Sequence, residues 1–308
     1  MDQGGVGAAL DRLGIDAPGL RTLPVAGAPE VVLAFDVHPA SWFDTWQSLR
    51  NAVDMLSLWP LATCTWGQPL EEISRWEMQG TDGLDVAPSA IIDRVPYVDV
   101  DRLLDDERKR QREQWMPSDD DFEWILDGAP DGIDLTLIHR ELGASPDLLD
   151  VERWLLDIEL ARGIPHDPSH NDQYLSWFVP DDVVMMLLPT TVPWASGAFV
   201  GGYEWGYPHT DLRTALLRRW HDRHGAEVAA NWGTMLQLVV HRPPTTIEAA
   251  WAVAYEINLI WPDTAGGGNG VATRRHARDL ADGRSGARNW TSSAWQRSAV
   301  RRSDLLPL

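Results

Sequence analysis

The sequence predicts an α+β protein in which mixed sheets are packed by amphipathic helices. Short apolar runs typical of buried strands, such as residues 31–35 and 183–188, alternate with segments whose apolar residues recur at helical spacing. The chain has 308 residues, 44% of them apolar, so it can form one or two domains with a substantial core. The pattern allows two similar α+β halves and leaves open whether they share one continuous sheet.

The chain begins with a lead-in rich in Gly, Ala and Pro over residues 1–29, in which we expect one short helix. After the first strand, apolar residues recur at steps of four and three, which predicts a helix over residues 42–56. Its buried face comprises Trp42, Trp46, Leu49, Val53 and Leu56. Ser41 and Asp44 have the spacing of a capping box at its start.

The dipeptide Trp59-Pro60 predicts the end of this helix, and residues 61–66 then have the pattern of a second strand. Within that strand we expect Cys64 to be a buried, inert thiol. The following segment, residues 99–127, is strongly charged. It predicts a solvated helix over about residues 100–115 and then an acidic loop that contains Asp119, Asp120 and Asp121.

A turn-rich stretch, residues 128–146, precedes the next predicted helix. We expect Ser145 to cap that helix and Gly163 to end it. Its buried stripe is Leu148, Val151, Leu155 and Ile158. Residues 164–180 are polar and punctuated by proline, which indicates a boundary between the two halves.

The second half is predicted to contain a strand, a loop rich in glycine and aromatic residues, a helix, a strand and two further helices. In order, these elements cover residues 183–188, 197–207, 210–224, 235–241, 245–260 and 271–282. The predicted organisation is a lead-in (1–29), an N-terminal α+β half (30–127) with its acidic segment (99–127), a helix and linker (128–180), a C-terminal α+β domain (181–296) and a basic tail (297–308).

Several segments carry a family resemblance. Residues 216–228, Leu-Leu-Arg-Arg-Trp-His-Asp-Arg-His-Gly-Ala-Glu-Val, the strand after them and Arg242-Pro243-Pro244 resemble an uncharacterised bacterial family, domain of unknown function 4253. The resemblance covers residues 180–296 well and residues 30–66 weakly. The chain departs from the family pattern at Trp261, where similar proteins carry Cys before Pro-Asp. Its terminal aromatic cluster is also more widely spaced than that of similar proteins. The family has no established catalytic residues, so the resemblance implies no site.

The charge of the chain is distributed unevenly. The formal net charge is −20, but residues 271–308 hold eight Arg against three Asp, so residues 1–270 carry −25. An acidic body repels nucleic acid and attracts basic partners. The N-terminus lacks the pattern of a secretory signal, and the densest apolar run, residues 183–188, is too short to span a bilayer. We therefore expect a cytoplasmic protein.

These features favour an interaction module, of immunity type or regulatory, that binds a basic protein. The candidate anchor is a loop with Tyr203, Trp205 and His209, because rigid aromatic side chains supply contact area. The same aromatics can instead fold onto the core. The candidate rim charges are Asp119, Asp120 and Asp121. The Arg-rich tail fits docking on the protein's own acidic body better than a nucleic-acid arm.

The alternative is a metal-assisted hydrolase. Its candidate ligands are His166 and His170, or His209, His221 and His224, since imidazole suits transition metals. Pro168 argues against a helix that would place the first pair on one face. The run of residues 266–270 before a predicted helix resembles an anion cradle, although a flexible turn explains it better. We therefore expect no metal, no cofactor and no catalytic residue.

Overall fold

The computed structural model describes most of the chain. The described residues are 3–65, 70–71, 73, 86–114, 117–126, 128–166, 180–200, 210–232, 235–260, 273–282 and 289–293. The chain forms two compact units, each assembled from separate stretches of sequence. Unit 1 comprises residues 1–98, 177–242 and 289–291, and unit 2 comprises residues 99–176, 243–288 and 292–308.

Unit 1 is built on one mixed sheet with the strand order β1-β2-β4-β3-β5-β6-β7. The strands are β1 (Arg21–Pro24), β2 (Val31–Val37), β3 (Trp59–Thr63), β4 (Val183–Leu188), β5 (Ala226–Asn231), β6 (Met235–Val240) and β7 (Asn289–Ser293). Neighbours pair antiparallel from β1 to β3 and between β5 and β6, whereas β3 and β5 are parallel. The α+β prediction is therefore confirmed, and strands from both halves of the sequence share one sheet.

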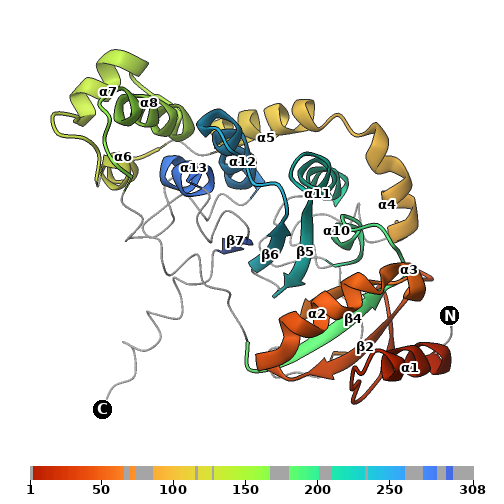
Figure 1. The fold of residues 1–308 in the computed structure, drawn as a ribbon. Helices are drawn as coiled ribbons and strands as arrows, with labels where there is room; N and C mark the ends of the chain where they lie inside the picture. Colours follow the sequence, from red (N-terminus) through yellow and green to blue (C-terminus); the bar gives the residue numbers. More distant parts are fainter. Residues whose placement is uncertain are drawn as a thin grey trace, which may run out of the picture. The chain divides into compact units, whose positions relative to one another are not determined.

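Strand β4 is an interior strand of the sheet and lies between β2 and β3. All six residues of β4 are buried, as expected for a continuous apolar run covered on both faces. The helices of unit 1 are α1 (Gln3–Arg12), η1 (Pro39–Ser41), α2 (Trp42–Asn51), α3 (Val53–Leu56), α4 (Pro88–Arg94), η2 (Val95–Tyr97), α10 (Ser196–Phe199) and α11 (Thr210–His224). Helix α2 lies across β4 (Figure 1) and buries Trp46 to 2% exposure.

Several predicted details of unit 1 are wrong. Ser41 makes no side-chain cap, because its hydroxyl donates to the carbonyl of His38. The predicted helix is divided at Ala52 into α2 and α3. Helix α3 ends at Leu56 with Ser57 in the left-handed conformation at φ 56°, so Trp59-Pro60 opens strand β3 rather than ending the helix. The lead-in contains β1 as well as a helix, β5 was not predicted, and the predicted loop over residues 197–207 begins within α10.

Unit 2 is helical in the part that the structure describes. Its helices are α5 (Val100–Gln114), α6 (Asp119–Leu126), α7 (Leu135–Leu142), α8 (Leu148–Ala161), α12 (Ile247–Ile260) and α13 (Thr273–Ala281). Helices α6, α7 and α8 share a small core of Phe122, Ile125, Ile138, Val151 and Leu155. Nowhere in the described residues is a helix long and apolar enough to cross a membrane.

In unit 2 the starts of helices α6, α7 and α8 differ from the predictions. The predicted acidic loop is helix α6, whose start is fixed by Ser118, because the Ser118 amide and hydroxyl both donate to Asp121. The predicted turn-rich stretch contains α7, capped by Asp134. Helix α8 is capped by Asp147 rather than Ser145, since the Asp147 carboxylate accepts from the amide of Leu149 at 2.7 Å. Its predicted end is confirmed by a φ of 62° at Gly163.

Candidate functional site

An open cleft in unit 1 has a volume of about 450 Å³, within the range of ligand-binding pockets. It is formed by the connection from α1 to β1, the end of β2 and the start of α2. Its lining contains acidic, apolar and neutral polar residues, and also His38. The acidic residues are Asp16, Asp36 and Asp44, and the apolar residues include Leu13, Ile15, Pro18 and Val37.

The three carboxylates of the cleft differ in their partners. Asp36 forms an ion pair with Arg21, with 3.0 Å between Oδ1 and Nη1. Asp44 lies in the first turn of α2, where the helix dipole stabilises negative charge. The side chains of Asp16 and Asp44 are exposed and make no hydrogen bond or ion pair with any residue that the structure describes. The cleft therefore presents two carboxylates without a partner among the described residues, in a lining that also contains apolar side chains, which suits a cation on an aliphatic stem.

A second polar cluster in unit 1 surrounds Glu227 on β5, whose side chain is 4% exposed. Arg50 binds it with two hydrogen bonds, Nη2 to Oε1 at 2.6 Å and Nε to Oε2 at 2.9 Å. The Nε2 atom of His241 lies 3.2 Å from Oε2. Burial alone would raise the pKa of Glu227, but the hydrogen bonds from Arg50 and His241 outweigh burial and hold this pKa below its ordinary value.

This cluster joins three segments that are distant in the sequence. Arg50 lies near the end of α2, Glu227 lies in β5, and His241 directly precedes Arg242-Pro243-Pro244. One buried carboxylate thus holds three distant segments together. The carboxylate is saturated with donors, so its evident role is to fix α2 on the sheet.

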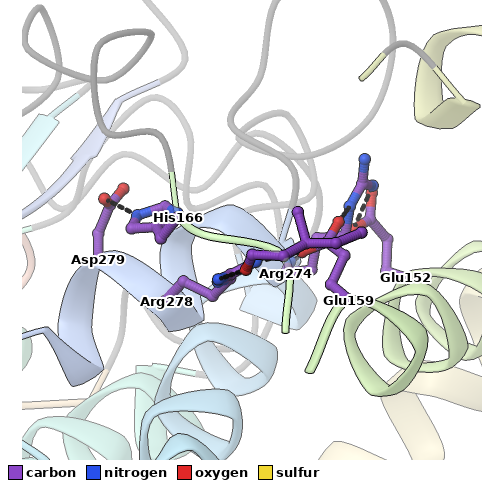
Figure 2. Close-up of polar contacts among 7 residues, drawn as sticks. Glu152, Glu159, His166, Arg274, Arg278 and Asp279 are labelled. Atoms are coloured by element: carbon purple, nitrogen blue, oxygen red, sulfur yellow. Dashed lines mark hydrogen bonds and ion pairs between the residues drawn. The ribbon is translucent and has the colours of Figure 1, made fainter. Parts of the chain in front are cut away.

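Unit 2 contains a buried ion-pair network between α8 and α13. Arg274, which is completely buried, donates from Nε to Glu159 at 2.9 Å and from Nη1 to Glu152 at 3.0 Å. Arg278 reaches the second oxygen of Glu159 at 2.8 Å. Figure 2 shows both arginines of α13 directed at the glutamates of α8. Burial raises the pKa of Glu152 above its ordinary value despite the opposing charge of Arg274.

The first turn of α13 already holds an anion of the chain itself. The main-chain amide of Arg274 donates to Glu152 at 3.3 Å, so this carboxylate lies where the helix dipole favours negative charge. Beside it, Nε2 of His166 lies 2.5 Å from Asp279, and both side chains are more than nine-tenths buried. These contacts dock α13 and the end of α8 on each other and explain the network as structural. The glycine run over residues 266–270 lies outside the described residues.

The predicted metal ligands have other partners where they are described. His166 contacts Asp279, and the Nδ1 atoms of His221 and His224 contact the main-chain oxygens of Ala226 and Arg242 at 3.2 and 3.1 Å. Within the described ranges, no group of three His, Cys, Asp or Glu side chains is arranged to hold a metal ion. His170 and His209 lie outside the described residues.

The predicted interaction residues are only partly described. Tyr203, Trp205 and His209 lie outside the described residues, as does the basic tail. The Asp119–Asp121 triplet forms the first turn of α6, where Asp121 accepts from Ser118. The side chains of Asp119 and Asp120 are also outside the description. The acidic cleft was not predicted, because its carboxylates are far apart in the sequence and only the sheet brings them together.

The fold therefore defines an α+β protein whose second half matches a known family model. Residues 184–291 match the family described as Domain of unknown function (DUF4253). The family resemblance predicted for the second half is confirmed. No curated protein and no solved structure matches the chain.

Proposed function

We propose that the protein is an interaction module that binds a basic protein partner through the acidic cleft of unit 1. The observation that carries this proposal is the pair of unpaired carboxylates, Asp16 and Asp44, in a cleft of about 450 Å³. An Arg or Lys side chain of a partner fits this chemistry, because its stem can pack on apolar residues of the lining while its head reaches the carboxylates.

The net charge of −20 supports the same proposal. A strongly acidic surface attracts cationic proteins over a distance and raises the rate of encounter, and salt screens this attraction. Long-range charge gives little selectivity, so a defined cleft is needed to distinguish partners. The aromatic loop with Trp205 remains a proposed second anchor. We propose that this binding of a basic protein serves an immunity-type or regulatory role.

The test compares two double variants that remove the same charge. The cleft variant is Asp16→Asn/Asp44→Asn, and the control is Asp106→Asn/Glu123→Gln, which alters two exposed carboxylates of unit 2. Proteins captured from native lysate at low salt should be basic, and their association rate should fall steeply towards physiological salt. We expect the cleft variant to lose about tenfold in affinity for the captured protein, and the control about twofold or less. Equal losses in both variants would contradict the cleft as the binding site.

A further inference from the structure

One carboxylate of the acidic cleft is already bound by a guanidinium of the chain itself. Nη1 of Arg21, at the start of β1, lies 3.0 Å from Oδ1 of Asp36 and donates to the carbonyl of Gly19 at 3.1 Å. The Oδ2 atom of Asp36 makes no hydrogen bond with any described residue. The pair therefore uses only one of the two carboxylate oxygens.

The ion pair between Arg21 and Asp36 is exposed to solvent, and Gly19 packs against it. The side chains of Arg21 and Asp36 are 32% and 60% exposed. Gly19 lies against them at φ +67°, and a Cβ atom there would approach Oδ2 of Asp36 to 3.2 Å and Nη1 of Arg21 to 3.4 Å. The absence of a side chain at Gly19 thus leaves room for the guanidinium of Arg21 beside Asp36. Exposed ion pairs contribute little to stability, so an incoming group can displace this one.

The chemistry of Asp36 favours arginine as the incoming group. A guanidinium forms two parallel hydrogen bonds with a carboxylate, whereas Arg21 makes one. A partner arginine at Asp36 would also lie in the cleft that Asp16 and Asp44 line. It would gain the second hydrogen bond and the attraction of two further carboxylates.

We propose that Arg21 is an internal competitor that occupies Asp36 until an arginine side chain of the partner replaces it. This inference rests on the proposed function, because it names the side chain that the cleft binds and the contact that restrains binding. Asp36 belongs to two ion pairs in turn: with Arg21 in the free protein and with the partner's arginine in the complex. Removal of Arg21 should therefore strengthen binding.

The experiment measures the affinity of the full chain for a fluorescein-labelled hexa-arginine peptide by fluorescence anisotropy. Arg21→Gln is compared with Arg94→Gln, which breaks an ion pair with Asp211 of 2.9 Å elsewhere in unit 1 and changes the net charge equally. We expect Arg21→Gln to tighten binding about two- to fivefold, the range that displacement of an exposed ion pair implies. Arg94→Gln should change it by less than about 1.5-fold.

Two further variants separate competition from other effects. Asp36→Asn should weaken binding, and the Arg21→Gln/Asp36→Asn variant should bind no better than Asp36→Asn. Arg21→Lys, which keeps the charge but not the planar donor pair, should lie between wild type and Arg21→Gln. A hexa-lysine peptide should gain less from Arg21→Gln than hexa-arginine does. Thermal melts of each variant establish that the fold is retained.

The outcomes distinguish the two proposals. If Arg21→Gln and Arg94→Gln tighten binding equally, net charge explains the effect and the competitor role is wrong. If Arg21→Gln weakens binding while the melt is unchanged, Arg21 supports the site rather than competing for it, and the role is again wrong. If Asp16→Asn/Asp44→Asn leaves peptide binding unchanged, the proposed function itself fails, whatever Arg21 does.

Discussion

Replacement of Arg274 by Met tests how the buried ion-pair network contributes to unit 2. Met is unbranched and uncharged, so it keeps the apolar stem of Arg274 while removing its charge and donors. Glu159 would keep Arg278 at 2.8 Å, but Glu152 would lose its only side-chain partner among the described residues. A carboxylate that is 4% exposed would then remain with one main-chain amide donor at 3.3 Å.

The expected loss is about 3–5 kcal/mol in the free energy of unfolding, because removal of one partner leaves a buried charge uncompensated. Denaturant titration followed by circular dichroism measures it. Arg102→Met is the matched control, since it removes one positive charge from an exposed position of α5 and should cost less than about 0.5 kcal/mol.

A second variant shows whether the loss comes from the stranded carboxylate. Arg274→Met/Glu152→Leu removes both charges, and we expect it to recover at least half of the loss, because an apolar pair can replace a buried ion pair at little net cost. If Arg274→Met is as stable as Arg102→Met, the network does not hold α13 on α8. If the double variant is no better than the single one, a buried unpaired charge is not the cause.

Four further results are expected. Trp220→Ala should cost about 3–5 kcal/mol in unfolding free energy because Trp220 is 1% exposed, whereas Met55→Ala, at 47% exposure, should cost less than about 1 kcal/mol. Hydrogen bonds hold the pKa of Glu227 in the folded protein below its ordinary value of 4.5. The stability that the ionised carboxylate contributes should therefore be lost as the pH falls from 4.5 through the folded pKa. Glu227→Gln should remove this pH dependence of the free energy of unfolding. Burial lowers the pKa of His276, so stability should fall as pH drops below its ordinary 6.5, and the decrease should be absent in His276→Gln. The melting temperature should be the same with and without EDTA, because the sequence shows no preorganised ligand set.

Helices with a strong apolar periodicity and strands with a continuous apolar run were predicted correctly from the sequence. Strand β4 at Val183–Leu188 occupies the predicted residues, and α5 and α12 begin and end within about two residues of the predicted positions. Strand β5 was missed for a physical reason. Its sequence, Ala-Glu-Val-Ala-Ala-Asn, has one β-branched residue and resembles a helix, but it pairs with β3 and β6 and is buried throughout. Tertiary pairing overrides local propensity here.

The contacts at the sites were less accessible to sequence reasoning. Asp16 lies in the connection from α1 to β1, Asp36 in β2 and Asp44 in α2, and no spacing rule links them. The buried role of Arg274 and Arg278 was also missed, because the eight arginines of the last 38 residues were interpreted only as a basic charge and as a tail that docks on the acidic body. The available signal was the spacing of Glu152 and Glu159 at i and i+7 on α8, opposite two arginines at i and i+4 on α13.

The fold also shows that the matched segment depends on strands from the first half of the chain. Strand β4 begins the matched segment, yet both of its neighbours, β2 and β3, come from the first half. Cut from the rest of the chain, residues 184–291 would expose both edges of β4, and Glu227 would lose Arg50. A buried carboxylate and a row of unpaired backbone groups are costly, so the matched segment needs a partner strand on each side. We therefore infer that residues 21–63 belong to the same folding unit as β4, β5 and β6, and that variants of the acidic cleft act on the domain that carries the family match.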